Sequence, residues 1–246
     1  LAHVIGYEGP IHKGAAAPLV VAPFDASEVH GHNGFGGVEC PDHKPLSEQS
    51  AFESAVELLQ THDKVTYVAL GPLTNLAILL KAHPELAEKI ECISLMGGGI
   101  KGGNTTIAGE FNFYADPHAA HIVFESGIPI IMAGLDVTER GYIDVKDIEL
   151  IRDEGGELGQ LLYDISQVSF KFAKDYLGKE RIHLHDAMSV LVLSHPDLFE
   201  SEDYYIRIST DENFMRGMSM ADRRPRSHDK PNTKVLLDVD RDRFRK

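Results

Sequence analysis

Two amide side chains and one carboxylate lie close together in the connection NTTIAGEFNFYADPHAA, which runs from Asn104 to Ala120. Asn104 and Asn112 offer fixed amide dipoles, and Glu110 offers a negative charge. Strand alternation explains part of the apolar pattern around them, but it does not require three hydrogen-bonding side chains. Such groups can orient a polar ligand and stabilise developing charge without reorganising, so this connection is a candidate binding site.

The motif HLHDAM brings His183, His185 and Asp186 together in front of the apolar run AMSVLVLS. A capped helix start would explain Asp186, because carboxylates favour that position. Imidazole and carboxylate ligands would suit a metallohydrolase, although the other histidines do not have matching spacing. In a third interpretation Asp186 binds a hard cation and His185 acts as an acid, since the unperturbed pKa of histidine is about 6.5.

Three further stretches could contribute to a site. Residues 97–103, GGGIKGG, have a GxGxxG spacing, but no helix start follows them. A tight crossover at a strand end therefore explains them better than a dinucleotide site.

Residues 28–37 carry His30 in a glycine-rich loop that is either a flexible connection or part of a functional site. After the apolar run VTYVAL, we expect Thr74 and Asn75 to cap a helix, and the carbonyl at the strand end could bind a hard cation.

Strands and helices alternate through the first half of the chain. The apolar spacing predicts buried strands over 65–70, 91–96 and 128–133. Helices are expected over 51–62, after the turn at 71–73, and over 116–127, where Asp116 is the N-cap. Residues 144–177 also read as helical. This alternation predicts an α/β fold with an open, mostly parallel sheet flanked by helices, in a single domain over residues 1–246.

The composition excludes several partners. The chain has 24 Lys and Arg against 38 Asp and Glu, a net charge of −14, so nucleic acid and anionic membranes are not expected as partners. No apolar run is long enough to span a bilayer. Two cysteines, Cys40 and Cys92, are too few for a disulfide framework, so we expect a reducing, cytoplasmic location.

Four stretches, in this order, resemble motifs of the nucleoside hydrolase family of the inosine-uridine preferring type. They are LGPLTNLAILL, SLMGGGIKGGNTTIAGEFNFYADPHAAHIVFESG, HLHDAM and RGMSMADRR. The resemblance covers nearly the whole chain. It implies an open α/β sheet and hydrolysis of the N-glycosidic bond of ribonucleosides of the inosine, uridine or cytidine type, giving ribose and free base in nucleoside catabolism.

Carried over residue by residue, the resemblance implies that Asn104, Glu110 and Asn112 hydrogen-bond the ribose, with Met96 packing beside it. It places His30 by the base. Breaking the C1′–N bond passes through an oxocarbenium-like ribosyl cation. Oriented amides and the charge of Glu110 would stabilise that cation.

The resemblance also implies a Ca²⁺ that binds the ribose 2′- and 3′-hydroxyls, with the backbone carbonyl of Leu70 and the carboxylate of Asp186 among its ligands. The family usually has Thr at position 70, but the ligand atom belongs to the main chain. His185 would protonate the departing base. The family forms dimers or tetramers, so a homodimer or homotetramer is expected. On the helical segment between 157 and 177, three aromatic residues are candidates to contact the base, although aromatics at helical spacing more often belong to the core: Phe170, Phe172 and Tyr176.

One family feature has no counterpart here, the aspartate-rich DTDxGxDD segment that supplies most metal carboxylates and the base that activates water. We expect an N-terminal segment with the first strand to be missing, because the sequence lacks an initiator Met and opens like the end of a helix. The 246-residue chain alone should then show little or no hydrolase activity. The alternatives are a catalytically dead truncated paralogue that binds ribonucleosides, or a different metal-dependent hydrolase that uses His183, His185 and Asp186.

Overall fold

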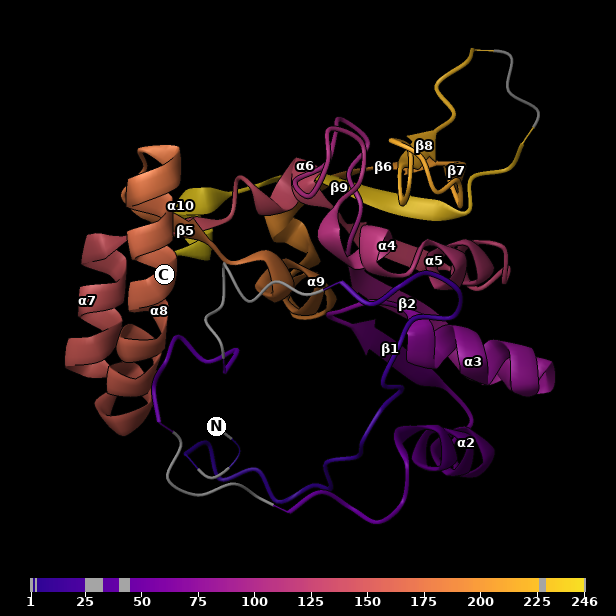
Figure 1. Cartoon of the computed structure of the whole chain (residues 1–246), viewed down its shortest axis with the longest axis horizontal. Helices are drawn as coiled ribbons and strands as arrows, with labels where there is room; N and C mark the ends of the chain where they lie inside the picture. Colours follow the sequence, from indigo (N-terminus) through magenta and orange to yellow (C-terminus); the bar gives the residue numbers. More distant parts are fainter. Residues whose placement is uncertain (1, 3, 25–32, 40–44, 226–228, 246) are drawn as a thin grey trace.

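The computed structural model describes residues 2, 4–24, 33–39, 45–225 and 229–245, and a five-stranded sheet lies at its centre (Figure 1). In spatial order the strands are β1 (Val65–Ala69), β2 (Ile90–Met96), β3 (Ile130–Ala133), β9 (Thr233–Val239) and β6 (Phe199–Tyr204). The first four pair in parallel, and β6 runs antiparallel to β9 at one edge. The predicted open, mostly parallel sheet is confirmed.

Helices precede and connect the parallel strands where the apolar spacing predicts them. Helix α2 (Ala51–Thr61) precedes β1, α3 (Thr74–Ala82) with the 3₁₀ helix η1 (Pro84–Lys89) connects β1 to β2, and α5 (Pro117–Phe124) leads into β3. Asp116 caps α5 as predicted, because its carboxylate accepts a hydrogen bond from the Ala119 amide at 3.0 Å and Pro117 opens the first turn. Gly127, with φ of 78°, then lets the chain turn into β3.

The start of α3 differs from the prediction. Thr74 donates its hydroxyl to Asp116 at 2.7 Å, and Asn75 accepts a hydrogen bond from the Ala15 amide at 2.8 Å. The second contact to that Asp116 oxygen comes from the Leu19 amide at 2.9 Å. These side chains bind the N-terminal segment to α3 and α5, and no side chain caps α3. The capping prediction was wrong because tertiary partners took the polar groups.

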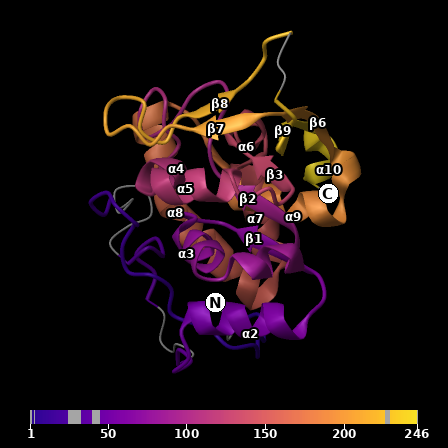
Figure 2. The ribbon, with the colours of Figure 1, turned by 90° about the vertical axis from the view of Figure 1, so that its right-hand side faces the viewer.

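Two apolar clusters cover the opposite faces of the sheet. Met132 and Val235 pack with α3 and α5, whereas their chain neighbours Ala133 and Leu236 pack with α6 (Leu135–Thr138) and α9 (His185–Ser194). Successive side chains of a strand point to opposite faces, so this division follows from the pleat. Figure 2 shows α3 and α5 on one side of the strands and α9 on the other.

Edge strand β1 is less buried than predicted. Its residues alternate between partly buried and exposed, and the side chain of Val68 is 39% exposed. Strands β7 (Ile206–Ile208) and β8 (Ser219–Ala221) form a separate antiparallel pair, and the 3₁₀ helix η2 (Pro196–Leu198) precedes β6. No helix among the described residues is long and apolar enough to cross a membrane.

A helical hairpin stands beside the sheet (Figure 1) and confirms the helical prediction for 144–177. It consists of α7 (Val145–Glu154) and α8 (Gly156–Leu177). Two short strands flank it, β4 (Tyr142–Asp144) and β5 (Arg181–His183), which pair antiparallel. Strands of three residues leave too short a pattern for the sequence to predict.

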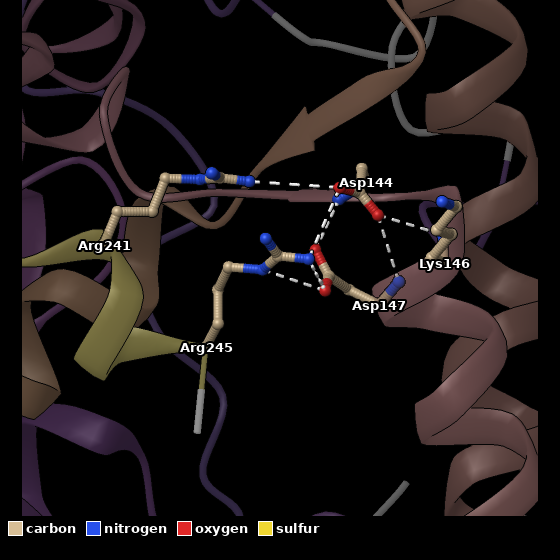
Figure 3. Close-up of polar contacts among 5 residues, drawn as sticks. All are labelled: Asp144, Lys146, Asp147, Arg241 and Arg245. Atoms are coloured by element: carbon tan, nitrogen blue, oxygen red, sulfur yellow. Dashed lines mark hydrogen bonds and ion pairs between the residues drawn. The ribbon is translucent and has the colours of Figure 1, made fainter.

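The C-terminal helix α10 (Arg241–Phe244) is tied to the start of this hairpin, as Figure 3 shows. Asp144 caps α7 by accepting hydrogen bonds from the amides of Lys146 at 3.0 Å and Asp147 at 3.2 Å. Arg245 binds the Asp147 carboxylate through Nε at 2.9 Å, and the terminal nitrogen of the same guanidinium makes a second contact to that oxygen. Since α10 follows β9 directly, these pairs hold the hairpin against the sheet.

Candidate active site

A pocket of about 810 Å³ lies at the carboxyl ends of β1 and β2 and reaches across to α8. Seven of the eight predicted site residues line it: Leu70, Met96, Asn104, Glu110, Asn112, His185 and Asp186. The eighth, His30, lies outside the described residues, although Gly34 and Phe35 of the same loop line the pocket. The connection that contains the amides and the motif that contains the histidine therefore meet in one place.

The sheet topology explains this meeting. Leu70 follows β1 directly, and Met96 is the last residue of β2. Because parallel strands end at the same edge, the loops that follow them converge there, and ligands of open α/β sheets bind at this edge. His185 and Asp186 begin α9, which packs against β2 and β3 and so brings its first turn to the same edge.

Glu110 is the most buried charged group of the pocket, with 2% of its surface exposed. It is the N-cap of α4 (Phe111–Ala115), and its carboxylate accepts hydrogen bonds from the amides of Asn112 at 2.9 Å, Phe113 at 3.3 Å and Gly98 at 2.7 Å. Burial raises the pKa of Glu110 to about 6, the backbone amides oppose that rise, and the charge of Asp186 adds to it. The group is therefore mostly ionised at neutral pH and is held in a fixed position.

In the side-chain amides of Asn104 and Asn112, one of the two polar atoms is hydrogen-bonded to the backbone. Asn112 donates from Nδ2 to the Met96 carbonyl at 2.9 Å, and the Met96 sulfur lies 3.3 Å from the same nitrogen. Asn104 accepts from the Phe111 amide at 3.0 Å through Oδ1. Among the described residues, no hydrogen bond involves Asn112 Oδ1 or Asn104 Nδ2. In each side chain the backbone thus holds one polar atom and leaves the other one without a hydrogen bond to a described residue.

His185 is anchored from the side of α6. Its Nδ1 atom lies 2.8 Å from the hydroxyl of Thr138, the last residue of α6. The ring of His183 packs 5.7 Å away, centroid to centroid, and partial burial lowers the pKa of His183, with the charge of Arg181 lowering it further. Sequence reasoning did not find Thr138, because nothing in GLDVTER relates it to a histidine far along the chain.

Asp186 does not cap α9. The N-cap residue is Leu184, which makes no side-chain cap, and Asp186 is the second residue of the helix. The structural interpretation of this aspartate as a cap is therefore wrong. Its carboxylate lines the pocket and acts electrostatically on Glu110.

The opposite wall of the pocket comes from α8. Its lining residues are aliphatic or small and polar: Leu162, Ile165, Ser166, Val168 and Ser169. The three predicted aromatic contacts are not among the residues that line the pocket. Phe170 packs in a cluster with Ile143 and Ile148, whereas Phe172 and Tyr176 stack on each other on the outer part of α8, where Tyr176 is 77% exposed. Phe170 thus lies behind Ile143 and Ile148, which do line the cavity, and the predicted base contacts are not confirmed.

A second loop braces the candidate site from behind. Ser219 of β8 accepts a hydrogen bond from the Gly99 amide at 2.9 Å and donates one to the Gly99 carbonyl at 3.0 Å. Arg216 donates from Nε to the Tyr114 carbonyl at 2.8 Å and stacks over the Tyr114 ring. The motif RGMSMAD thus supports the glycine run and the connection after it, although it does not line the pocket.

The described residues offer an incomplete metal site. They contain no group of three or more His, Cys, Asp and Glu side chains that could hold a metal ion. His183, His185 and Asp186 do not form such a group in the part of the chain that the structure describes, so nothing there supports the metallohydrolase interpretation. The Asp186 carboxylate and the Leu70 carbonyl are oxygens that Ca²⁺ accepts, but Ca²⁺ takes six to eight oxygens. These two groups alone do not fit a complete Ca²⁺ site.

Comparisons of sequence and of fold both find nucleoside hydrolases. The chain matches the family model described as "Inosine-uridine preferring nucleoside hydrolase" over residues 1–246. It is 39% identical over 238 residues to the pyrimidine-specific ribonucleoside hydrolase RihA of Salmonella typhi, over 96% of this chain and 76% of that protein. The fold is similar to that of a plant nucleoside hydrolase, with a TM-score of 0.91 and 27% identity over 99% of this chain and 81% of the other. A purine-preferring ribonucleoside hydrolase from Gardnerella vaginalis gives a TM-score of 0.90 and 30% identity, over 99% and 79% of the two chains.

Proposed function

The chain belongs to the inosine-uridine preferring nucleoside hydrolase family, whose members hydrolyse ribonucleosides to ribose and free base, and we propose that the pocket at the ends of β1 and β2 is where this chain carries out that reaction. The observation that supports this placement is the meeting of Glu110, Asn112 and His185 around one cavity. The 104–112 connection supplies a charge and an oriented amide, and the distant motif HLHDAM supplies a candidate acid.

We assign the sugar to the side of the pocket formed by the 104–112 connection. Cleavage of the C1′–N bond builds positive charge on the ribosyl ring. The ionised Glu110 provides negative potential there, and its position is fixed by three backbone amides, so little reorganisation accompanies the charge development. Asn104 and Asn112 are proposed to hydrogen-bond the sugar hydroxyls through the polar atoms that the backbone does not hold.

We assign the base to the side formed by α8 and His185. The bond electrons move to the base nitrogen as the C1′–N bond breaks, and a proton from His185 neutralises the departing base. A water molecule adds to C1′ of the ribosyl cation and loses a proton to solvent, which completes the hydrolysis to ribose. General acid catalysis of this kind contributes about 10²–10⁴-fold to a rate. The proposed contacts from α8 are aliphatic side chains and the hydroxyls of Ser166 and Ser169, which suit a flat, partly polar base.

We propose pyrimidine ribonucleosides, uridine and cytidine, as the first substrates to test. The relative with 39% identity is named as pyrimidine-specific, which supports this choice. Purine ribonucleosides are the second candidate, because a structure with 30% identity is named as purine-preferring. The two groups of base differ in size, so a series of nucleosides separates them.

We propose Asp186 and the Leu70 carbonyl as two contributors to a Ca²⁺ site, because both line the pocket and both present oxygen. No step of the reaction is assigned to the ion, since the described residues do not complete its coordination. When bound, Ca²⁺ would orient the sugar hydroxyls.

An assay of free base in phosphate-free buffer with Ca²⁺ tests the proposed function. The protein expressed from its gene should release base from uridine and cytidine, and the comparison with inosine and adenosine gives the base preference. Release from none of the four nucleosides, with a folded protein, would overturn the proposal. Release from purines but not pyrimidines would change the substrate and leave the reaction in place.

A further inference from the structure

Thr138 occupies an unusual place for a hydroxyl. It ends the four-residue helix α6 after β3 and has no exposed surface. Its backbone amide donates to the Gly134 carbonyl at 3.0 Å, so the backbone needs no hydrogen bond from the side-chain hydroxyl. The hydroxyl instead lies 2.8 Å from Nδ1 of His185. A buried hydroxyl needs a partner, and here the partner is the imidazole of the proposed acid.

The surroundings make this contact rigid. The α6 residue Val137 and the α9 residue Met188 have no exposed surface and pack in the same apolar cluster. Helix α6 therefore cannot move relative to the first turn of α9 without opening that cluster. The His183 ring, 5.7 Å from the His185 ring, closes another side. The imidazole of His185 is thus confined by packing and is hydrogen-bonded to Thr138.

The orientation matters because the two ring nitrogens have distinct roles. The hydrogen bond made by one nitrogen determines which way the other nitrogen faces and which one carries the proton. If Nδ1–H donates to the Thr138 oxygen, Nε2 lies across the ring and faces away from α6. His185 lines the pocket, so this arrangement directs Nε2 toward the bound base.

We propose that Thr138 is a positioning residue for His185: its hydroxyl accepts a hydrogen bond from Nδ1–H and so holds Nε2–H toward the leaving base. The proposal rests on the proposed function, in which His185 protonates that base. Thr138 itself touches neither sugar nor base. Its effect should therefore appear only where the leaving group needs a proton.

The test compares two leaving groups in two variants. Thr138→Val keeps the branched shape and removes the hydroxyl, whereas Thr138→Ser keeps the hydroxyl. We expect Thr138→Val to lower kcat for uridine by on the order of tenfold to a hundredfold, a part of the general-acid contribution. Hydrolysis of p-nitrophenyl riboside, whose leaving group needs no proton, should stay near the wild-type rate. Thr138→Ser should restore most of the activity toward uridine.

The results separate the inference from the proposed function. No release of base or nitrophenol by the wild-type protein would count against the proposed function itself. Wild-type activity together with equal slowing of both substrates by Thr138→Val, or with no slowing, would overturn the role of Thr138 alone. In a His185→Ala background, Thr138→Val should cause no further loss, because the two residues act as one unit. A further loss would contradict the proposal.

A spectroscopic measurement keeps the proposal testable if Thr138→Val does not fold. Nitrogen-15 NMR of histidine-labelled wild-type protein, with His185 assigned from the His185→Ala spectrum, reports which ring nitrogen carries the proton in the neutral form. The proposal predicts the Nδ1–H tautomer, and the same tautomer in Thr138→Ser. An Nε2–H tautomer with unprotonated Nδ1 would contradict it.

Discussion

The Glu110 carboxylate accepts a hydrogen bond from the backbone amide of Gly98 at 2.7 Å. This contact joins the glycine run after β2 to the connection that contains the two asparagines. The Phe113 ring packs so closely on the run that a Cβ atom on Gly98 would lie 2.5 Å from it, and Gly98 has a φ of 70°. Glycine is needed here for both reasons. The run therefore serves the site by positioning a carboxylate rather than by binding phosphate.

Glu110 should make stability depend on pH in the acid range. Its pKa is raised by burial from 4.5 to about 6 in the folded protein, so folding favours the protonated form. The stability contributed by this group is greatest below about pH 4.5 and is lost as pH rises through about 6, an effect of roughly 2 kcal/mol. Urea unfolding of wild type and Glu110→Gln between these pH values measures it. The wild type should lose stability relative to the variant as pH rises, and a constant difference would refute the raised pKa.

His185→Ala should slow nucleosides far more than an activated riboside. Loss of a general acid costs about 10²–10⁴-fold in kcat when the leaving group needs a proton, and p-nitrophenolate needs none. Steady-state rates with uridine, inosine and p-nitrophenyl riboside measure the difference. His195→Ala is the matched control, because His195 is exposed and ends α9 away from the pocket. Equal slowing of all three substrates would remove His185 from the acid role.

Ser219→Ala should weaken both stability and sugar binding. The variant leaves the amide and the carbonyl of Gly99 without the partners they have at 2.9 and 3.0 Å. Leaving buried polar groups unpaired costs about 1–3 kcal/mol, and a displaced glycine run would raise KM for uridine. Denaturant unfolding and KM check both effects. Ser194→Ala, at an exposed helix end, is the control, and equal effects of the two variants would count against the bracing role.

Ca²⁺ should bind weakly to the chain of residues 1–246. One carboxylate and one carbonyl are few ligands for a cation that takes six to eight oxygens, so we expect a Kd of about 10⁻³ M or weaker. Asp186→Asn should abolish the remaining binding. Asp153→Asn, at an exposed position of α7, should leave the affinity unchanged. Isothermal titration calorimetry measures the affinity. A micromolar Kd for the wild-type chain would show that the two oxygens have partners beyond those proposed.

The sequence alone predicted those helices and strands whose apolar spacing is regular and whose ends are marked by residues such as Asp, Pro and Gly. Helix α5 was predicted because Asp116, Pro117 and Gly127 mark its ends. Residues 144–177 were predicted to be helical, but not their division into α7 and α8. The site residues of the 104–112 connection could be named in advance because they are close in sequence and unusual in type. Their meeting with His185 and Asp186 follows from the shared edge of parallel strands.

The remaining features depend on contacts between distant segments. Thr74 and Asn75 looked like helix caps, but Asp116 and the N-terminal segment bind them in the fold. The aromatic residues of α8 have helical spacing, but the residues of α8 that line the pocket are Leu162, Ile165, Ser166, Val168 and Ser169. Thr138 pairs with a histidine that lies 47 positions later in the sequence. No local pattern contains such pairings, because each is set by how two elements pack.

The most direct test of the account follows the products of uridine cleavage in phosphate-free buffer with Ca²⁺. It compares the wild-type protein expressed from its gene with its Asn112→Leu variant, which keeps the approximate shape and removes the amide. Chromatography of uracil and a reducing-sugar assay should give the two products in equal amounts for the wild type. The variant should show a strongly raised KM, because a hydrogen bond to the sugar is lost. Uridine that binds but is not cleaved by the wild type, or an unchanged KM in the variant, would contradict the proposed active site.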